Sequence, residues 1–138
     1  MARTSKARTV QTVQHDLIDD IIAKLNELDG IEFAKDAWVN KAPEVYGVVT
    51  LDSEISQLWG DGHLLDSIYS ITVAAYVNGD SYALPEGIQA KLEELEEGGR
   101  IDLTHTVNRE FDYETGKVRW QWIVRAYGPL TWTETAGE

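Results

Sequence analysis

The longest regular pattern in the chain runs from Ile101 to Tyr127, where apolar and polar residues alternate in two successive runs. A period of two is that of a half-buried β-strand. Between the runs lies Glu114-Thr115-Gly116-Lys117, a turn sequence in which Gly116 is free to adopt a positive φ. If Glu114 pairs with Lys117, the register places the following residues opposite one another: Phe111 and Trp120, Arg109 and Trp122, Val107 and Val124, Asp112 and Arg119. We therefore predict a long C-terminal β-hairpin, with Arg109 over Trp122 as a cation–π pair.

Two other segments have helical spacing. In residues 12–28 the apolar positions recur at intervals of three and four, with Thr12 as the expected N-cap and Gly30 just beyond the end. Pro85–Glu97 has Pro85 near its start and two glycines after its end, which are the usual boundary signals. Each segment has one apolar stripe, so each predicts a helix that packs on one face of a sheet.

Shorter strands are expected at Ile31–Trp38 and Val45–Leu51, and a long one at Leu64–Asn78. Gly47, inside the second, suggests a bulge or a close approach of another group. The stretch from Asp52 to His63 has no regular period and is expected to be a loop. Its apolar residues, Leu58 and Trp59 among them, form either a minor core or a contact surface for a partner.

Together these elements predict an α+β fold: an antiparallel β-sheet with a long C-terminal hairpin and two α-helices packed on one face. The length of 138 residues fits one domain, which we place at residues 12–130. Residues 1–11 are expected to form a flexible basic arm, and residues 131–138 a loose C-terminal tail.

Composition narrows the function classes. The chain has no cysteine, which excludes disulfides, thiolate catalysis and cysteine-based zinc sites and fits a reducing cytoplasm. No apolar run approaches the roughly 20 residues of a membrane span. The net charge of −12 argues against a protein that binds nucleic acid through a basic face. The acidity serves either solubility or a surface that must repel DNA or meet a basic partner.

The charge is unevenly distributed. Arg3, Lys6 and Arg8 give the basic arm +3, so the rest of the chain carries −15, since −12 minus +3 is −15. Four glutamates, Glu93, Glu94, Glu96 and Glu97, lie near the C-terminal end of the second predicted helix, where the helix dipole disfavours anions. Helix stability does not explain this placement, so these residues are candidates for a face that requires negative charge.

No catalytic or metal-binding constellation is visible. His15, His63 and His105 are scattered, and the pair Asp61-x-His63 lacks a third ligand nearby. Phosphate-binding glycine motifs and the G-x-S-x-G nucleophile motif are absent from the sequence. We therefore expect neither an enzyme nor a cofactor. The five tryptophans either line a pocket or supply core area.

The order of elements resembles that of the tail terminator and tail-completion proteins of long-tailed bacteriophages, including neck proteins of the minor capsid type. The resemblance spans Val13 to Tyr127 and rests on four segments: His15–Gly30, Leu64–Gly79, Pro85–Gly99 and Ile101–Tyr127. It implies a virion protein, assembled in the host cytoplasm, that forms a hexameric ring on the tail tube and joins tail to head.

Within such a ring the partners are other copies of the chain, the tail tube protein and a head-completion or connector protein. DNA passes through an acidic lumen without specific binding, and Glu93, Glu94, Glu96 and Glu97 are the candidate lumen residues. The candidate subunit interface comprises Arg3, Lys6, Arg8, Leu58 and Trp59. The alternative is a monomeric acidic binding module or inhibitor that uses a tryptophan-rich face, and a small enzyme is a third possibility.

Overall fold

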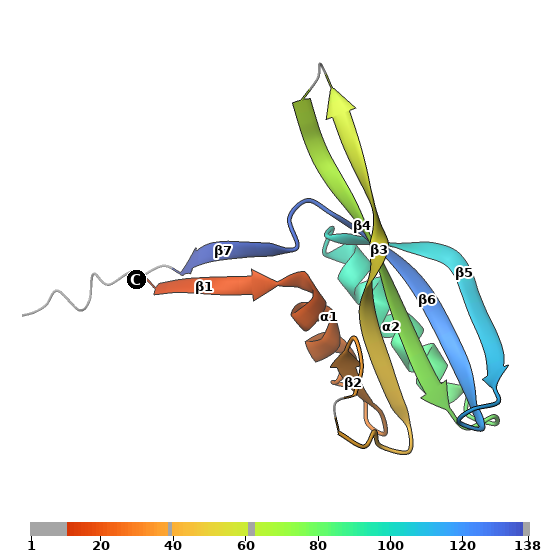
Figure 1. Cartoon of the computed structure of the whole chain (residues 1–138). Coiled ribbons are helices and arrows are strands. Elements are labelled where there is room, and N and C mark those ends of the chain that lie inside the picture. Colours follow the sequence, from red (N-terminus) through yellow and green to blue (C-terminus); the bar gives the residue numbers. More distant parts are fainter. Residues whose placement is uncertain (1–10, 39, 61–62, 137–138) are drawn as a thin grey trace, which may run out of the picture.

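The computed structural model describes residues 11–38, 40–60 and 63–136, and within them leaves some side chains undescribed. It shows an α+β fold built on a five-stranded sheet of order β2-β3-β4-β6-β5 and a separate two-stranded ribbon, β1-β7 (Figure 1). Neighbouring strands are antiparallel except β2, which runs parallel to β3. The elements in chain order are β1 (Gln11–Asp16), α1 (Leu17–Leu25), β2 (Glu32–Lys35), β3 (Tyr46–Gly60), β4 (His63–Val77), α2 (Ala83–Glu97), β5 (Ile101–Asp112), β6 (Lys117–Tyr127) and β7 (Thr131–Ala136).

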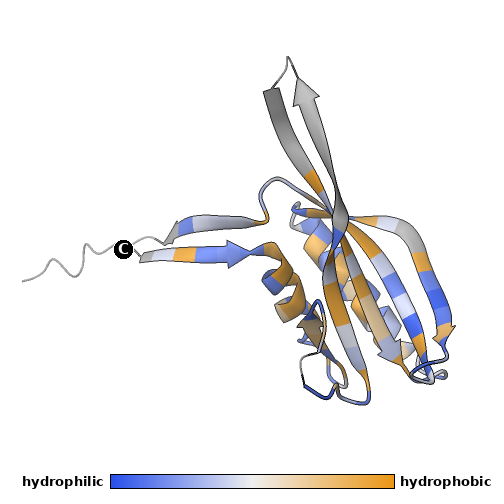
Figure 2. Cartoon of the chain, viewed as in Figure 1, coloured by the Kyte–Doolittle hydropathy of each residue, from blue (hydrophilic) through white to orange (hydrophobic). Residues whose placement is uncertain are grey.

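Both helices lie on one side of the five-stranded sheet, as predicted (Figure 1). The core between them and the sheet is apolar, and hydrophobic residues are concentrated in α1 and the neighbouring part of the sheet (Figure 2). Alternate residues of the central strands point into this core, because side chains of a strand alternate between its two faces. The fully buried side chains include Ile21, Leu25, Val49, Ile71, Val73, Ile88, Leu92 and Val124.

Gly47 provides the close approach that the sequence suggested. It pairs with Phe33 across the parallel strands β2 and β3, and the Phe33 ring covers it. A Cβ at Gly47 would lie 2.1 Å from Cε2 of that ring, so no larger residue fits without displacing it. The Phe33 backbone is held in turn by Asn26, whose Oδ1 accepts its N–H at 2.7 Å.

The first helix begins later than predicted. Thr12 is not its N-cap, because residues 11–16 form β1 and pair with β7. Asp16 is the cap, with extended backbone and a carboxylate that accepts the N–H groups of Ile18 and Asp19 at 2.9 and 3.2 Å. The helix also ends earlier, at Leu25, and Gly30 lies in the following turn with φ of 90°.

The C-terminal hairpin is present, but its predicted register is wrong by two residues. Lys117 pairs with Asp112 rather than with Glu114, and Trp120 lies opposite Arg109 rather than Phe111. The cause is a longer loop, in which the Asp112 carbonyl accepts the N–H of Gly116 at 2.8 Å and its carboxylate accepts the Thr115 hydroxyl at 2.8 Å. Gly116 has the predicted positive φ, 73°.

The shifted register also moves the remaining predicted partners. Trp122 faces Val107, and Arg119 faces Glu110. Between Leu103 and Val107 an irregularity in β5 shifts the register again, so that Leu103 faces Val124. Arg109 lies over Trp120 and Tyr82, not over Trp122.

Two segments expected to be irregular are strands. The predicted loop at Asp52–His63 is wrong for residues 52–60 and for His63, which belong to β3 and β4. These strands pair as far as Gly60 and His63, with two irregularities, and form a ribbon that extends past the rest of the sheet (Figure 1). The predicted loose tail is also wrong for Thr131–Ala136, which forms β7 and pairs with β1 from Gln11 to Asp16. The rest of the predicted basic arm, residues 1–10, lies outside the described residues.

Candidate functional site

The acidic end of α2 is the first candidate site, and its four glutamates do not share one role. Lys24 of α1 lies 2.8 Å from Glu94 and 3.8 Å from Glu27. Its hydrogen bond and charge lower the pKa of the Glu94 carboxyl, and the same bond raises the pKa of Lys24. Lys91 extends the network, because its Nζ donates to Glu27 Oε1 at 2.8 Å and lowers the pKa of that carboxyl. Glu94 therefore joins the two helices.

Glu96 has a different partner. Its Oε2 accepts the backbone N–H of Leu103 at 2.9 Å, where β5 begins the irregularity that ends at Val107. β5 is an edge strand of the sheet, and a backbone N–H there needs an acceptor, which this carboxylate supplies. The contact between the two helices thus explains Glu94 and the contact between α2 and the sheet explains Glu96, contrary to our expectation that stability would explain none of the four.

Glu93 and Glu97 remain as exposed charges on the outer surface of α2. Glu93 accepts a hydrogen bond from the Gln89 amide at 3.0 Å, one turn earlier on the same helix. Residues four apart share a helix face, so Glu93 and Glu97 point the same way. Of the four candidate lumen residues, these two are available to a partner or to a channel.

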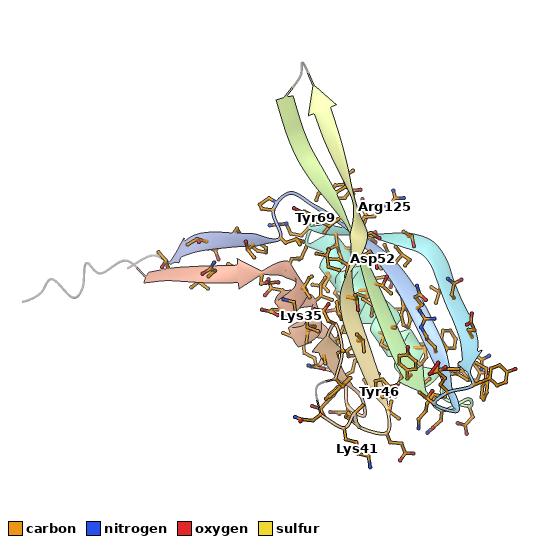
Figure 3. The ribbon with its side chains drawn as sticks, viewed as in Figure 1. Lys35, Lys41, Tyr46, Asp52, Tyr69 and Arg125 are labelled. Carbon is orange, nitrogen blue, oxygen red and sulfur yellow. The ribbon has the colours of Figure 1, made fainter. Side chains whose placement is uncertain are left out.

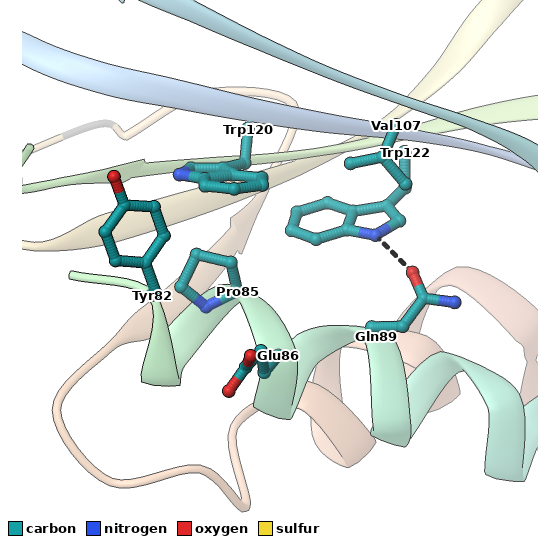
Figure 4. Close-up of a pocket in the computed structure, with 7 residues that line it drawn as sticks. All are labelled: Tyr82, Pro85, Glu86, Gln89, Val107, Trp120 and Trp122. Carbon is teal, nitrogen blue, oxygen red and sulfur yellow. Dashed lines mark hydrogen bonds between the residues drawn. The ribbon is translucent and has the colours of Figure 1, made fainter. Parts of the chain in front are cut away.

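An aromatic groove is the second candidate site, and no sequence motif had marked it. It has a volume of about 380 Å³ and lies between the start of α2 and strands β5 and β6 (Figure 4). Its lining residues are Tyr82, Pro85, Glu86, Gln89, Val107, Trp120 and Trp122. The spacing of Trp120 and Trp122 on one strand face was visible in the sequence, but their proximity to Tyr82 depends on how α2 packs.

The two tryptophans of the groove differ in burial. Trp122 is 2% exposed, and its Nε1 donates to Gln89 Oε1 at 2.8 Å. Trp120 is only partly buried; its Nε1 is shielded from solvent and has no hydrogen-bond partner among the described residues. Tyr82 meets Trp120 edge to face and is 54% exposed. The groove therefore has an apolar floor with an unsatisfied donor and an aromatic rim open to solvent.

The apolar surface continues past the groove. Val107 and Phe111 on β5 and Tyr113 in the following turn are 39%, 48% and 89% exposed. With Tyr82 they account for all but one of the exposed large hydrophobic residues in the described part of the chain. Arg109 lies among them, with Cζ 5.5 Å from the centroid of Trp120 and 5.7 Å from that of Tyr82.

The uncovered face of the sheet is polar. Asp52 accepts the hydroxyl protons of Ser70 and Thr72, both at 2.9 Å, and lies along β3 from Tyr46 (Figure 3). Tyr46 stacks on Tyr76 with ring centroids 4.8 Å apart, and burial raises its pKa. A hollow of about 390 Å³ lies between these groups. Neighbouring side chains satisfy Asp52, so this face contains a structural network rather than a reactive group.

The predicted subunit interface is only partly described. The backbone of Leu58 and Trp59 belongs to the projecting part of β3, but their side chains are outside the described part of the structure. Arg3, Lys6 and Arg8 also lie outside it. The structure does place the start of β1, which follows these three cations, on a ribbon that projects from the body (Figure 1).

The side chain of one of the three histidines is described. The His15 ring stacks on Trp132 at 5.0 Å, and its Nε2 donates to Glu134 Oε1 at 2.9 Å, so it holds β1 to β7. The side chains of His63 and His105 are not described, and neither is Asp61. Within the described ranges, no three or more acidic, histidine or cysteine side chains are grouped to hold a metal ion. Neither helix in those ranges has the length and apolar character needed to cross a membrane.

Comparison with known proteins adds no assignment. The chain matches no model of a protein family, and a search of curated proteins finds no relative.

Proposed function

We propose that this chain is a structural subunit of a long-tailed phage neck, which forms a ring on the tail tube and joins tail to head. In this proposal the ring is a hexamer, DNA passes through its lumen without specific binding, and the subunit has no catalytic role and no cofactor. Its partners are other copies of itself, the tail tube protein and a head-completion or connector protein.

The observation that carries the proposal is the pair of projecting ribbons. β1 and β7 pair with each other outside the five-stranded sheet, and β3 and β4 continue past it (Figure 1). A two-stranded ribbon alone is marginally stable in water, and a neighbouring subunit would stabilise the projecting part of each ribbon. A ring joins two different surfaces of each subunit, and a ribbon that reaches a neighbour provides one of them.

The charge distribution supports a DNA channel through Glu93 and Glu97. Both are exposed on α2, and the chain carries a net charge of −12. At physiological salt a carboxylate repels phosphate over a Debye length of about 8 Å, which is enough to hold a duplex away from a narrow wall. Glu94 and Glu96 are left out of this role because Lys24 and the Leu103 N–H occupy them.

The first test is assembly state. The mass of the full chain is measured by native mass spectrometry, alone and with tail tubes, since a terminator can stay monomeric until it meets the tube. We expect a hexameric ring at the tube end in electron micrographs. A chain that remains single and leaves the tubes unchanged would refute the ring.

The second test concerns the channel. Glu93→Lys with Glu97→Lys should leave the thermal midpoint within a few degrees of the wild type and reduce DNA delivery by assembled particles. The matched control is Glu110→Lys with Glu114→Lys, the same charge change on exposed residues of the C-terminal hairpin. Equal loss of delivery in both variants would remove α2 from the channel wall.

The aromatic groove favours one alternative, a monomeric acidic binding module or inhibitor that uses its tryptophan-rich face. It predicts a different outcome in the assembly test and adds a test of its own. The mass stays that of one chain in the presence of tubes, and Tyr82→Ser abolishes binding of the target while ring formation is not observed.

A further inference from the structure

The basic segment of this chain, residues 1–10, leaves the molecule at a defined point. β1 runs toward the body and Gln11 is its outermost residue, so the preceding residues start from the tip of the β1-β7 ribbon (Figure 1). Three of them, Arg3, Lys6 and Arg8, are cationic, and the rest of the chain carries −15. A cationic segment is thus presented at the point farthest along the ribbon from its own acidic body.

The reach of that segment decides which body it can contact. β1 has six residues and is about 20 Å long. Arg8 and Lys6 precede Gln11 by three and five residues, so their Cα atoms lie at most about 10 and 17 Å from it. Neither cation can run back along its own ribbon to the base. Arg3 precedes Gln11 by eight residues, so its Cα atom can extend at most about 7 Å past the base of the ribbon. The reach of the backbone therefore favours a contact of Arg8 and Lys6 with another molecule over one with the body of their own chain.

The aromatic groove has the chemistry to accept a cation. Trp120 and Tyr82 present π-faces, and Glu86 adds a carboxylate at the edge (Figure 4). Aromatic faces attract guanidinium and ammonium groups within about 6 Å of the ring centroid. Arg109 already lies at 5.5 and 5.7 Å from these rings, near that limit, with its Nη2 bonded to the Gly79 carbonyl at 3.2 Å. Arg109 is therefore near the distance limit for both rings, and Tyr82 is 54% exposed to solvent.

We propose that the basic segment of one copy docks in the aromatic groove of a second copy, with Arg or Lys side chains against Tyr82 and Trp120 and beside Glu86. This rests on the ring proposed above and names the contact by which one subunit holds the next. The donor is the ribbon tip and the acceptor is the groove at the start of α2, two different surfaces, as a head-to-tail contact requires.

The test uses the full chain as receptor and a synthetic peptide of residues 1–10 as the probe. The receptor carries Arg3→Gln, Lys6→Gln and Arg8→Gln, so that its own segment does not compete. Titration is followed by the indole N–H resonance of Trp120. We expect that resonance to shift with saturation. We also expect the Kd to rise about tenfold or more when Tyr82→Ser and Glu86→Gln are added, because a cation–π contact and an ion pair are lost.

The control receptor carries Tyr113→Ser and Glu114→Gln, the same two side-chain changes at an exposed turn outside the groove. It should bind the peptide like the parent receptor. Tyr82 and Glu86 are both exposed, so their replacement leaves the core intact. An unmoved Trp120 resonance, or equal affinity in the groove and control variants, would overturn the docking site.

The outcome is separable from that of the ring itself. If a hexamer forms but the peptide does not bind in the groove, this contact is overturned and the ring remains. Peptide binding in the groove, without a ring at the end of the tail tube, overturns the ring and leaves in place the docking of the segment in the groove.

Discussion

Trp122 holds the C-terminal hairpin to α2, and its replacement should be among the most damaging single changes in the chain. The side chain is 2% exposed and lies beside Val73 on β4 and Val107 on β5. A buried tryptophan removes about 200 Å² from water, which at about 25 cal/mol per Å² amounts to roughly 5 kcal/mol. Measured aromatic-to-alanine changes in cores cost about 3–5 kcal/mol, so we expect Trp122→Ala to lower the free energy of unfolding by that amount.

Variants of Trp122 and Gln89 separate the contribution of packing to stability from that of the hydrogen bond between them. Trp122→Phe keeps most of the buried apolar area and removes the indole N–H donor. The half-buried Gln89 carbonyl can then bond to water, so loss of the hydrogen bond costs only about 1 kcal/mol. Gln89→Leu leaves the buried indole N–H unpaired and costs about 1–3 kcal/mol. The double variant should cost less than the sum of the two single variants, since neither partner then remains unpaired.

Urea unfolding at pH 7, followed by far-UV circular dichroism, gives all four free energies. Trp122→Ala with an unchanged unfolding midpoint would show that the ring is exposed, and the aromatic face would then become an interface. Strict additivity in the cycle would refute the hydrogen bond between β6 and α2.

Two further predictions concern stability. Gly47→Ala should lower the free energy of unfolding by about 1–3 kcal/mol or more, because the added methyl group overpacks against Phe33. In a Phe33→Leu background the same change should cost less. Urea unfolding of the four proteins measures both costs, and equal costs would refute the contact between Gly47 and Phe33. Lys24 lowers the pKa of Glu94 below its ordinary value of 4.5, so the stabilisation is present above that pH and is lost as the pH falls through the lower folded-state value. The thermal midpoint of Glu94→Gln should therefore fall less steeply with decreasing pH below 4.5 than that of the wild type. The control variant Glu93→Gln should follow the wild type. Parallel declines in the wild type and both variants would exclude the ion pair between Lys24 and Glu94.

The hairpin shows how much of the fold could be predicted from the sequence. Alternation fixes which side chains face the core, and Trp122, Val124 and Ala126 are buried as that pattern requires. The register depends on the loop, which Asp112 lengthens by its own hydrogen bonds. Because the error is two residues, every side chain keeps its predicted face; an error of one would have reversed them all.

The ribbons could not be predicted in the same way. A strand signals itself through alternation only when one of its faces is buried, and the outer part of β3 and β4 extends past the helices that would bury it. β1 pairs with β7, more than a hundred residues away, and Val13 continues the apolar stripe of α1 closely enough to suggest one longer helix.

The candidate site was likewise only partly predictable from the sequence. The acidic residues of α2 were visible as a cluster, but whether each had a partner depended on Lys24 from another helix and on the backbone of Leu103. The aromatic groove joins Tyr82, before α2, to Trp120 on β6, and only packing brings them together. Local sequence thus identified the residue types, and tertiary structure determined which of them remain available.

The pairing of β1 with β7 also sets an order for synthesis. His15 leaves the ribosome 117 residues before Trp132, its partner across the ribbon, since 132 minus 15 is 117. At about 5–20 residues per second, β1 waits roughly 6–23 seconds without the strand it pairs with. The sheet and both helices are already complete when β7 appears, so the ribbon forms last. A chain interrupted before Thr131 would lack the ribbon and also Trp132, which packs against the core.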